Sequence, residues 1–317
     1  MQRDVESPTL EITVPQTDRP VPLLARWLAQ AALKRWPASA FHATGDDART
    51  TSRDGYVAWR VATLRQQLLD HFDPALLAAA DVLDFGSGRG ELTQMLVRDF
   101  DVRQATGIEL NPVGVHDARR FAAEQPEPIR DRLRYIHVDD ATTIPLPDAS
   151  VDLICCFDVV EHIPAIAATC REWRRVLRPG GRVWIWWSPW RGPYGHHVEA
   201  LLPLPWIHLL LPARTIFAAC AALYDHPRYE ARVWDRDPVT GAKRENPWHA
   251  KRTYEPFLNR LTAGQFERTC RAAGLHIARH QAHGFSGSWK TRLTRPLRHL
   301  PAIGECFVSY HIYELGR

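Results

Sequence analysis

The sequence feature that most constrains the fold is an apolar run that leads into a glycine-rich loop and then into a helical segment. It reads VLDFGSGRGE over residues 82–91 and continues as LTQMLVRDF over residues 92–100. Glycine lets the backbone turn sharply and lets a ligand lie against it without side-chain obstruction. This order predicts a ligand-binding loop at the end of a strand, with a tight turn that binds nothing as the structural alternative.

Downstream of this loop, short apolar runs alternate with helical segments. The runs predicted to be strands are residues 82–85, 105–110, 133–138, 151–157, 182–187, 275–278 and 305–315. Helices are expected at residues 91–100, 113–124, 166–177 and 261–274. The alternation is typical of βαβ units and predicts an α/β protein with a mostly parallel sheet, whose ligands bind at the carboxyl ends of the strands.

The remaining segments predict a tail, two helices and a long insertion. Residues 1–20 are expected to be a loose tail, 23–36 a helix stopped by Pro37, 43–55 a linker, 56–69 a second helix and 279–299 a solvated loop. Residues 188–258 are rich in proline, tryptophan and histidine, and a stretch of this length predicts a lid. We therefore expect an N-terminal tail and helix (1–54), a ligand-binding core (55–187), a lid insertion (188–258) and a completion of the core sheet (259–317).

Composition excludes several classes of protein. The 40 basic and 36 acidic residues leave a net charge of +4, which is too balanced to indicate a nucleic-acid partner. The six cysteines include no C-x-x-C pair and the first residues show no apolar signal segment, so a cytoplasmic protein is expected. Residues 200–223 are apolar but hold three prolines, which favours a buried or lid segment, or one that touches lipid, over a membrane anchor. A homodimer is left open.

Acidic residues follow the second and third predicted strands. Glu109 can accept hydrogen bonds from both hydroxyls of a ribose. Asp140 can accept a hydrogen bond from the exocyclic amine of an adenine, and the Ala141 backbone N–H would lie beside it. The structural alternative is an aspartate that only stabilises a turn. The third glycine arrives one residue earlier than in the dinucleotide pattern G-x-G-x-x-G, which argues against a bound pyrophosphate.

Together these pieces resemble the class I S-adenosylmethionine-dependent methyltransferases, in the branch that acts on small molecules. The matching stretches are VLDFGSGRGELT, GIELN, VDDATTIPLPDASVDLI, CCFDVVEHIP and REWRRVLRPGGRVWIW, in that order. The resemblance is strong over residues 55–187 and weak over residues 259–317. It implies a Rossmann-like, doubly wound sheet of seven strands with one antiparallel strand, here residues 305–315, and S-adenosylmethionine as the cofactor.

The resemblance also implies the residues that hold this cofactor. The loop from Asp84 to Gly90 would bind its methionine part, Glu109 its ribose, and Phe157 the region of methyl transfer. The full set that it implies is Asp84, Gly86, Ser87, Gly88, Gly90, Glu109, Leu110, Asp140, Ala141 and Phe157.

Catalysis by this family requires mainly alignment of an acceptor with the methyl group, and a general base only for a hydroxyl or a protonated amine. The candidate catalytic residues are Asp158, His162, His196 and His197, and structural roles for the histidines are the alternative. No metal is predicted, because adjacent histidines diverge, although His196, His197 and Glu199 are a conceivable ligand set.

Aromatic residues predict the acceptor pocket. Strand alternation puts Trp184 and Trp186 in the core, whereas Trp187 and Trp190 would wall a pocket in which aromatic faces favour a cationic centre. The predicted acceptor-binding residues are Trp187, Trp190, Tyr194, Trp206 and His208.

The sequence therefore predicts a methyltransferase that moves a methyl group from S-adenosylmethionine to a small, specialised metabolite by in-line displacement. Residues 188–258 would choose the acceptor, whose nucleophilic atom the sequence does not specify. Two alternatives stay open, namely a nicotinamide-dependent oxidoreductase on the same fold and a non-catalytic, methyltransferase-like binding subunit.

Overall fold

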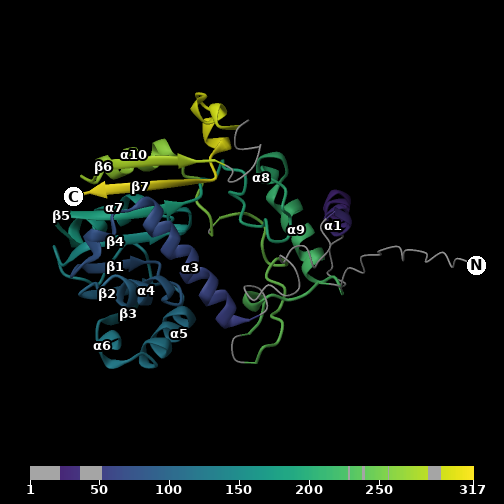
Figure 1. Ribbon diagram of the computed structural model, residues 1–317. Helices are drawn as coiled ribbons and strands as arrows, with labels where there is room; N and C mark the ends of the chain where they lie inside the picture. Colours follow the sequence, from purple (N-terminus) through teal and green to yellow (C-terminus); the bar gives the residue numbers. More distant parts are fainter. Residues whose placement is uncertain (1–21, 36–51, 228, 238–239, 256, 285–293) are drawn as a thin grey trace, which may run out of the picture. The chain divides into compact units, whose positions relative to one another are not determined.

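The computed structural model describes residues 22–35, 52–227, 229–237, 240–255, 257–284 and 294–317 (Figure 1). The chain divides into two compact units. The sheet unit comprises Val57–Gly195 and Glu255–Arg317, and the helical unit comprises Met1–Tyr56 and His196–Tyr254. The predicted tail and most of the predicted linker, residues 43–51, lie outside the described residues.

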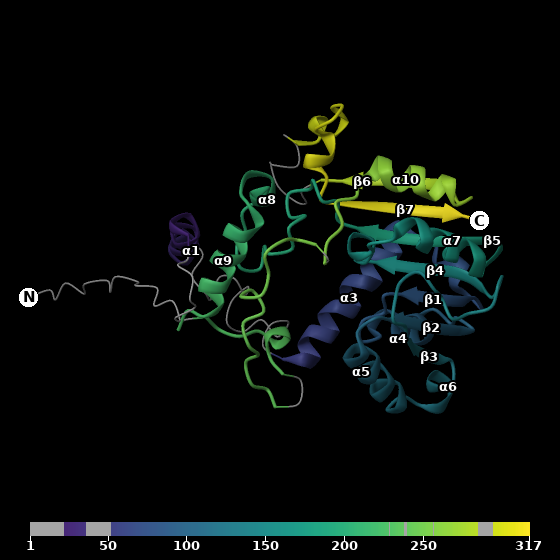
Figure 2. The same ribbon diagram turned by 180° about the vertical axis from the view of Figure 1, so that it is seen from behind.

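The sheet unit is built on a seven-stranded sheet with the order β3-β2-β1-β4-β5-β7-β6 (Figure 1). The strands are β1 (Asp81–Phe85), β2 (Gln104–Glu109), β3 (Leu133–His137), β4 (Val151–Phe157), β5 (Leu177–Trp187), β6 (His276–His283) and β7 (Tyr310–Gly316). The first five pair in parallel, and β7 runs antiparallel to both of its neighbours, as its arrow shows in Figure 2. The predicted seven-stranded sheet with one antiparallel strand is confirmed.

Helices cover both faces of this sheet. They are α3 (Arg53–His71), α4 (Glu91–Asp99), α5 (Pro112–Ala123), α6 (Glu127–Arg130), α7 (Ile166–Val176) and α10 (Ala263–Ala272), with short 3₁₀ turns η2 (Pro74–Leu77), η3 (Val160–His162), η5 (Pro296–His299) and η6 (Gly304–Phe307). One apolar core joins the sheet to α3, α4 and α5, and a second joins it to α7 and α10. Parallel strands read as near-continuous apolar runs because both of their faces are buried in this way.

Three strand boundaries differ from the sequence prediction by more than one residue. β5 begins at Leu177 rather than at residue 182, because residues 178–181 bulge out between two stretches of pairing with β4. β7 begins at Tyr310 rather than at residue 305, because η6 precedes it. β6 extends to His283, so residues 279–283 form a strand and not the predicted solvated loop.

The helical unit holds α1 (Leu23–Arg35), α8 (Ile207–Leu210), α9 (Ala213–Tyr224) and the 3₁₀ turn η4 (Val233–Asp235). α1 packs on α9 through a buried stripe that includes Leu28, Ala29 and Ala32 (Figure 1). The helix predicted over residues 23–36 is thus confirmed as far as Arg35, and the second predicted helix begins three residues early, at Arg53. None of the described helices has both the length and the apolar character that crossing a membrane requires.

Candidate active site

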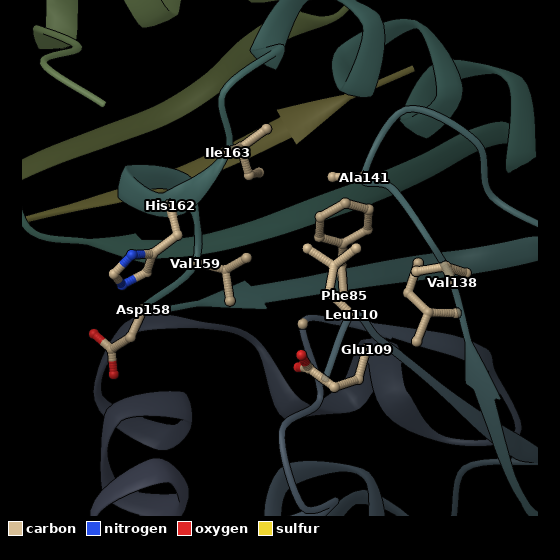
Figure 3. Close-up of a pocket in the computed structure, with 11 residues that line it drawn as sticks. Phe85, Glu109, Leu110, Val138, Ala141, Asp158, Val159, His162 and Ile163 are labelled. Atoms are coloured by element: carbon tan, nitrogen blue, oxygen red, sulfur yellow. The ribbon is translucent and has the colours of Figure 1, made fainter. Parts of the chain in front are cut away.

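A cavity of about 250 Å³ lies at the carboxyl ends of β1, β2 and β4, within the sheet unit (Figure 3). Its lining residues are Phe85, Gly86, Ile108, Glu109, Leu110, Val138, Ala141, Asp158, Val159, His162 and Ile163. Figure 3 shows Asp158 and His162 at one end, Val138 and Ala141 at the other, and the Glu109 carboxylate between them. The cavity therefore has a polar end, an apolar end and one acid along its length.

The glycine loop is fastened to β2 by its own backbone. The N–H groups of Gly86 and Ser87 both donate to the Ile108 carbonyl, at 2.9 and 3.0 Å. Gly86 has φ +79°, and a Cβ atom there would lie 2.5 Å from a methyl group of Val159. The loop thus needs glycine at this position both for its backbone conformation and for its close contact with the chain after β4.

Gly90, the glycine that arrives one residue early, begins α4. It is the N-cap of that helix with φ +86°, and a Cβ atom would lie 2.6 Å from the Tyr135 hydroxyl. Burial of the Tyr135 ring, which raises the pKa of its hydroxyl, leaves little room for that ring to move. The early glycine therefore serves the contact between helix and sheet, and it does not line the cavity.

Glu109 is held in place by two backbone N–H groups. Its Oε2 accepts from Gly88 at 2.9 Å and its Oε1 accepts from Asn111 at 2.8 Å. Asn111 in turn caps α5 by accepting the Val113 N–H. A carboxylate has about four lone-pair sites, so two remain available for hydroxyl donors from a ligand.

Apolar side chains form the walls beside this acid. Phe85 and Ile108 come from β1 and β2, and Val138 and Ala141 come from the loop after β3. Ala141 is fixed from behind, because its carbonyl accepts the Thr169 hydroxyl of α7 at 3.0 Å. Uncharged, apolar walls of this kind suit a purine ring.

Asp158 stands at the polar end in an uncommon backbone conformation. It has φ +57°, and its N–H donates to the Trp186 carbonyl of β5 at 2.9 Å. Its Oδ2 accepts from Arg60 of α3 at 2.8 Å. Arg60 precedes the first of the five matching sequence stretches, which begins at residue 82, and no pattern in its helix marks it, so it was absent from the predicted set.

A short turn behind Asp158 carries His162 and a buried acid, Glu161. His162 contacts the Phe257 carbonyl through Nδ1 at 2.6 Å, and Asn259 donates to the carbonyls of η3 and Ile163. Burial, followed by the nearby charge of Asp158, raises the pKa of Glu161 to about 8. Glu161 was also absent from the predicted set, although it lies beside His162 in the sequence.

Asp84 and Ser87 of the loop are buried and do not line the cavity. Asp84 is 3% exposed, its Oδ2 accepts the Thr93 hydroxyl of α4 at 2.6 Å, and burial raises its pKa to about 7. Ser87 is buried and its carbonyl accepts the Gly90 N–H at 2.8 Å. These two residues shape the loop from inside.

Two predicted cofactor residues lie away from the cavity. Asp140 is exposed and forms a turn in which its Oδ1 accepts both the N–H and the hydroxyl of Thr142, which lowers its pKa. This is the turn role that the sequence left open. Phe157 points to the opposite face of the sheet and stacks on Phe72, the residue after α3, with ring centres 5.7 Å apart. Gly88 borders Glu109 and Leu110 lines the cavity, as expected from their positions.

The aromatic residues predicted for the acceptor have different surroundings. Trp187 is 1% exposed and packs against Phe266 in the core, so the expected pocket wall is a core residue. Trp186, predicted for the core, is partly buried and lines a second cavity of about 400 Å³ with α3 and Tyr310. The Arg260 guanidinium lies over the Trp190 ring, 5.2 Å from the ring centre. Tyr194 is 36% exposed.

The remaining predicted residues belong to the helical unit. His196 is fully buried, its Nε2 donates to the Leu204 carbonyl at 3.1 Å, and its Nδ1 accepts the Val198 N–H at 3.0 Å. Burial lowers its pKa to about 3. His208 packs edge-on against it with ring centres 5.2 Å apart, while His197 and Trp206 each adopt a positive φ. The unit thus uses His196 as a structural, neutral side chain.

The doubly wound sheet, the glycine loop fastened to the second strand and the acid at the end of that strand define a nucleotide-binding α/β domain. Residues 83–185 match the family model described as a methyltransferase domain. The chain therefore contains the domain of the class I S-adenosylmethionine-dependent methyltransferases, and the resemblance seen in the sequence is confirmed. The cofactor of that domain is S-adenosylmethionine.

Curated relatives match the same region. The chain is 28% identical over 156 residues to the ubiquinone biosynthesis O-methyltransferase of Albidiferax ferrireducens, covering 49% of this chain and 58% of that protein. It is 33% identical over 152 residues to the 27-O-demethylrifamycin SV methyltransferase of Amycolatopsis mediterranei, covering 47% and 50%. The chain thus spans about half the length of the curated relatives it matches.

Among solved structures, the geranyl diphosphate C-methyltransferase from Streptomyces coelicolor is similar with a TM-score of 0.47 at 16% identity. The match covers 81% of this chain and 76% of that one.

Proposed function

We propose that this protein transfers the methyl group of S-adenosylmethionine to a small-molecule acceptor by in-line displacement. The observation that carries the proposal is the cavity at the strand ends, where Glu109 is held by the Gly88 N–H beside apolar walls. The match of residues 83–185 to the methyltransferase domain supports the same activity.

The residues of the cavity fit an adenosyl group. Glu109 has acceptor capacity left for two ribose hydroxyls after its two backbone hydrogen bonds. A Cβ atom on Gly88 would meet nothing within 4 Å, so the space above this part of the loop is open. The apolar end near Ala141 suits the purine, and the polar end near Asp158 would then face the sulfonium and the acceptor.

The bound cofactor supplies an already activated methyl group. The work of the chain is therefore to orient the acceptor and to exclude water, which together can provide on the order of 7–11 kcal/mol. Asp158 is suited to orientation because Arg60 and the Trp186 carbonyl both hold it.

His162 is the best-placed candidate base among the predicted histidines. Because its Nδ1 faces a carbonyl oxygen, Nδ1 carries the hydrogen and Nε2 carries the lone pair that a proton acceptor needs. His196 is not retained as a base, because both of its ring nitrogens are bonded within the helical unit. A base matters for hydroxyl acceptors, and the first relative named above is an O-methyltransferase, so hydroxyl compounds are the first class to screen.

We further propose that residues 188–258 choose the acceptor. Support comes from the position of this segment in the chain directly after β5, whose carboxyl end neighbours the cavity strand β4. An exchange of these residues against those of a related methyltransferase should change which acceptor is used and leave cofactor affinity within about twofold.

Calorimetric titration and a labelled-methyl assay test the proposal together. We expect S-adenosylhomocysteine to bind, NAD not to bind, and label from the cofactor to appear in a hydroxyl compound of a metabolite pool. Binding of NAD alone would favour an oxidoreductase. Binding of S-adenosylhomocysteine with no transfer to any acceptor pool would favour a binding subunit.

A further inference from the structure

The helical unit exposes large apolar side chains in two places. The first place is on α1, where Leu23 is 83% exposed and Trp27 is 62% exposed. The second is at the end of α8, where Leu210 is 77% exposed and Leu209 lies next to it in the chain. α1 and α8 both contact α9, so the two places belong to one packed group of helices. Such clusters of exposed apolar residues mark interaction sites when they lie close together.

α1 is apolar on both of its sides. One stripe, which includes Ala25, Leu28 and Ala32, is buried. A surface helix normally presents polar residues opposite its buried stripe. Here the other side presents Leu23, Leu24 and Trp27 together with basic residues, so packing within the unit does not account for its composition.

The charged residues of α1 and of residues 200–224 are all basic. α1 carries Arg26, Lys34 and Arg35 and no acidic residue. Residues 200–224, which contain α8 and α9, hold Arg214 and likewise no acidic residue. Tryptophan and leucine next to basic side chains are the composition of helices that lie in the interface of an anionic membrane.

We propose that α1 and residues 209–214 form a membrane-contact surface that binds anionic lipid headgroups. The leucines and Trp27 enter the boundary between headgroups and acyl chains, and the basic side chains pair with lipid phosphates. α1 has 13 residues and is about 20 Å long, so it lies along the membrane plane and does not cross it. Two copies of this chain would bring like charges together here, which disfavours self-association as the use of the surface.

Vesicle flotation of the full chain tests the proposal. We expect binding to vesicles of phosphatidylglycerol and phosphatidylcholine, weaker binding at high salt, and little binding to phosphatidylcholine alone. The double variants Leu23→Ser with Trp27→Ser, and Leu209→Ser with Leu210→Ser, should each weaken binding about tenfold or more. Replacing Arg26 by Gln should weaken it about fivefold.

The controls are Leu76→Ser and Ile303→Ser, which alter exposed apolar residues of the sheet unit and should leave binding unchanged. Circular dichroism verifies that every variant is folded. The proposal is overturned if the native chain does not float with anionic vesicles, if both vesicle types bind equally, or if the controls weaken binding as much as the double variants. It is also overturned if the double variants abolish a concentration-dependent dimer and leave vesicle binding intact.

Discussion

The sheet unit and the helical unit use their polar groups differently. In the sheet unit, backbone N–H groups hold Glu109 at the rim of a cavity, where its remaining lone pairs can serve a ligand. In the helical unit, Asp235 is bonded to Tyr229 and to the Arg232 N–H, and Arg232 donates to the Ala200 carbonyl. The acid of the first region borders a cavity, whereas Asp235 and Arg232 of the second connect η4 to neighbouring loops.

Buried ionisable groups, by contrast, occur in both units. The sheet unit buries acids, and burial raises the pKa of Asp84 to about 7 and of Glu161 to about 8. Both units bury imidazoles, and burial lowers the pKa of His196 and of His311 to about 3. Burial likewise raises the pKa of Glu199 in the helical unit, so the two regions respond to burial in the same way.

The largest expected effect concerns the packing of the glycine loop. Gly90→Ala should destabilise the sheet unit by about 3 kcal/mol, because its Cβ atom meets the Tyr135 ring and its backbone has φ +86°. Gly180→Ala is the matched control, since φ is +82° there and a Cβ atom would meet nothing within 4 Å. Urea unfolding should give about 1–2 kcal/mol for the control. Equal losses would show that the contact with Tyr135 does not matter.

The second prediction separates two acids that the sequence treated alike. Glu109→Ala should weaken binding of S-adenosylhomocysteine about thirtyfold, because it removes about 2 kcal/mol of charge-assisted hydrogen bonds at the cavity. Asp140→Ala should weaken it less than about threefold, because this side chain is exposed and bonded to its own turn. Calorimetric titration measures both. If Asp140→Ala weakens binding more than Glu109→Ala does, Asp140 contacts the adenine as the sequence predicted.

The sheet unit was predictable because its signals are local and periodic. The apolar runs, the glycine loop and the acid after the second strand each follow from a few neighbouring residues, and Glu109 lies where the pattern places it. β6 was missed in large part because its sequence, HIARHQAH, is mostly polar and lacks a continuous apolar run. Its strand form depends on pairing with β7, which is distant in the sequence.

The residues that were misplaced depend on contacts that no local pattern reveals. Trp186 and Trp187 are neighbours on one strand, and only the packing of α3 and α10 decides which of them borders a cavity. Phe157 was expected at the cavity, but strand alternation turns it toward Phe72. The roles of Arg60 and Asn259 likewise arise from tertiary contacts across about a hundred residues.

The third prediction compares how the stability of each unit changes when the pH is lowered. A buried histidine whose folded pKa lies below its unfolded value of 6.5 binds its proton only after unfolding, so stability is lost as pH falls below about 6.5. At pH 5, His196 and His311 should each cost about 2 kcal/mol. Hydrogen exchange at pH 7.5 and pH 5 should show His196→Asn reducing the acid sensitivity of the helical unit only. His311→Asn should do so in the sheet unit only, and a shared response would mean that the units unfold together.

The smallest expected effect concerns the ion pair that joins α3 to the polar end of the cavity. Arg60 lies outside the matched methyltransferase domain, whereas its partner Asp158 lies inside it. Because Asp158 is partly exposed, the ion pair between the two contributes at most about 1 kcal/mol. Arg60→Gln should therefore lower kcat/KM for methyl transfer about threefold to fivefold, through kcat, because Asp158 loses its orientation while Glu109 still binds the cofactor. Arg60→Lys should restore most of the rate, since a positive charge remains within reach. If Arg60→Gln instead lowers only the urea midpoint and leaves kcat unchanged, the pair serves the packing of α3 alone, and the positioning of Asp158 rests on its bond to the Trp186 carbonyl.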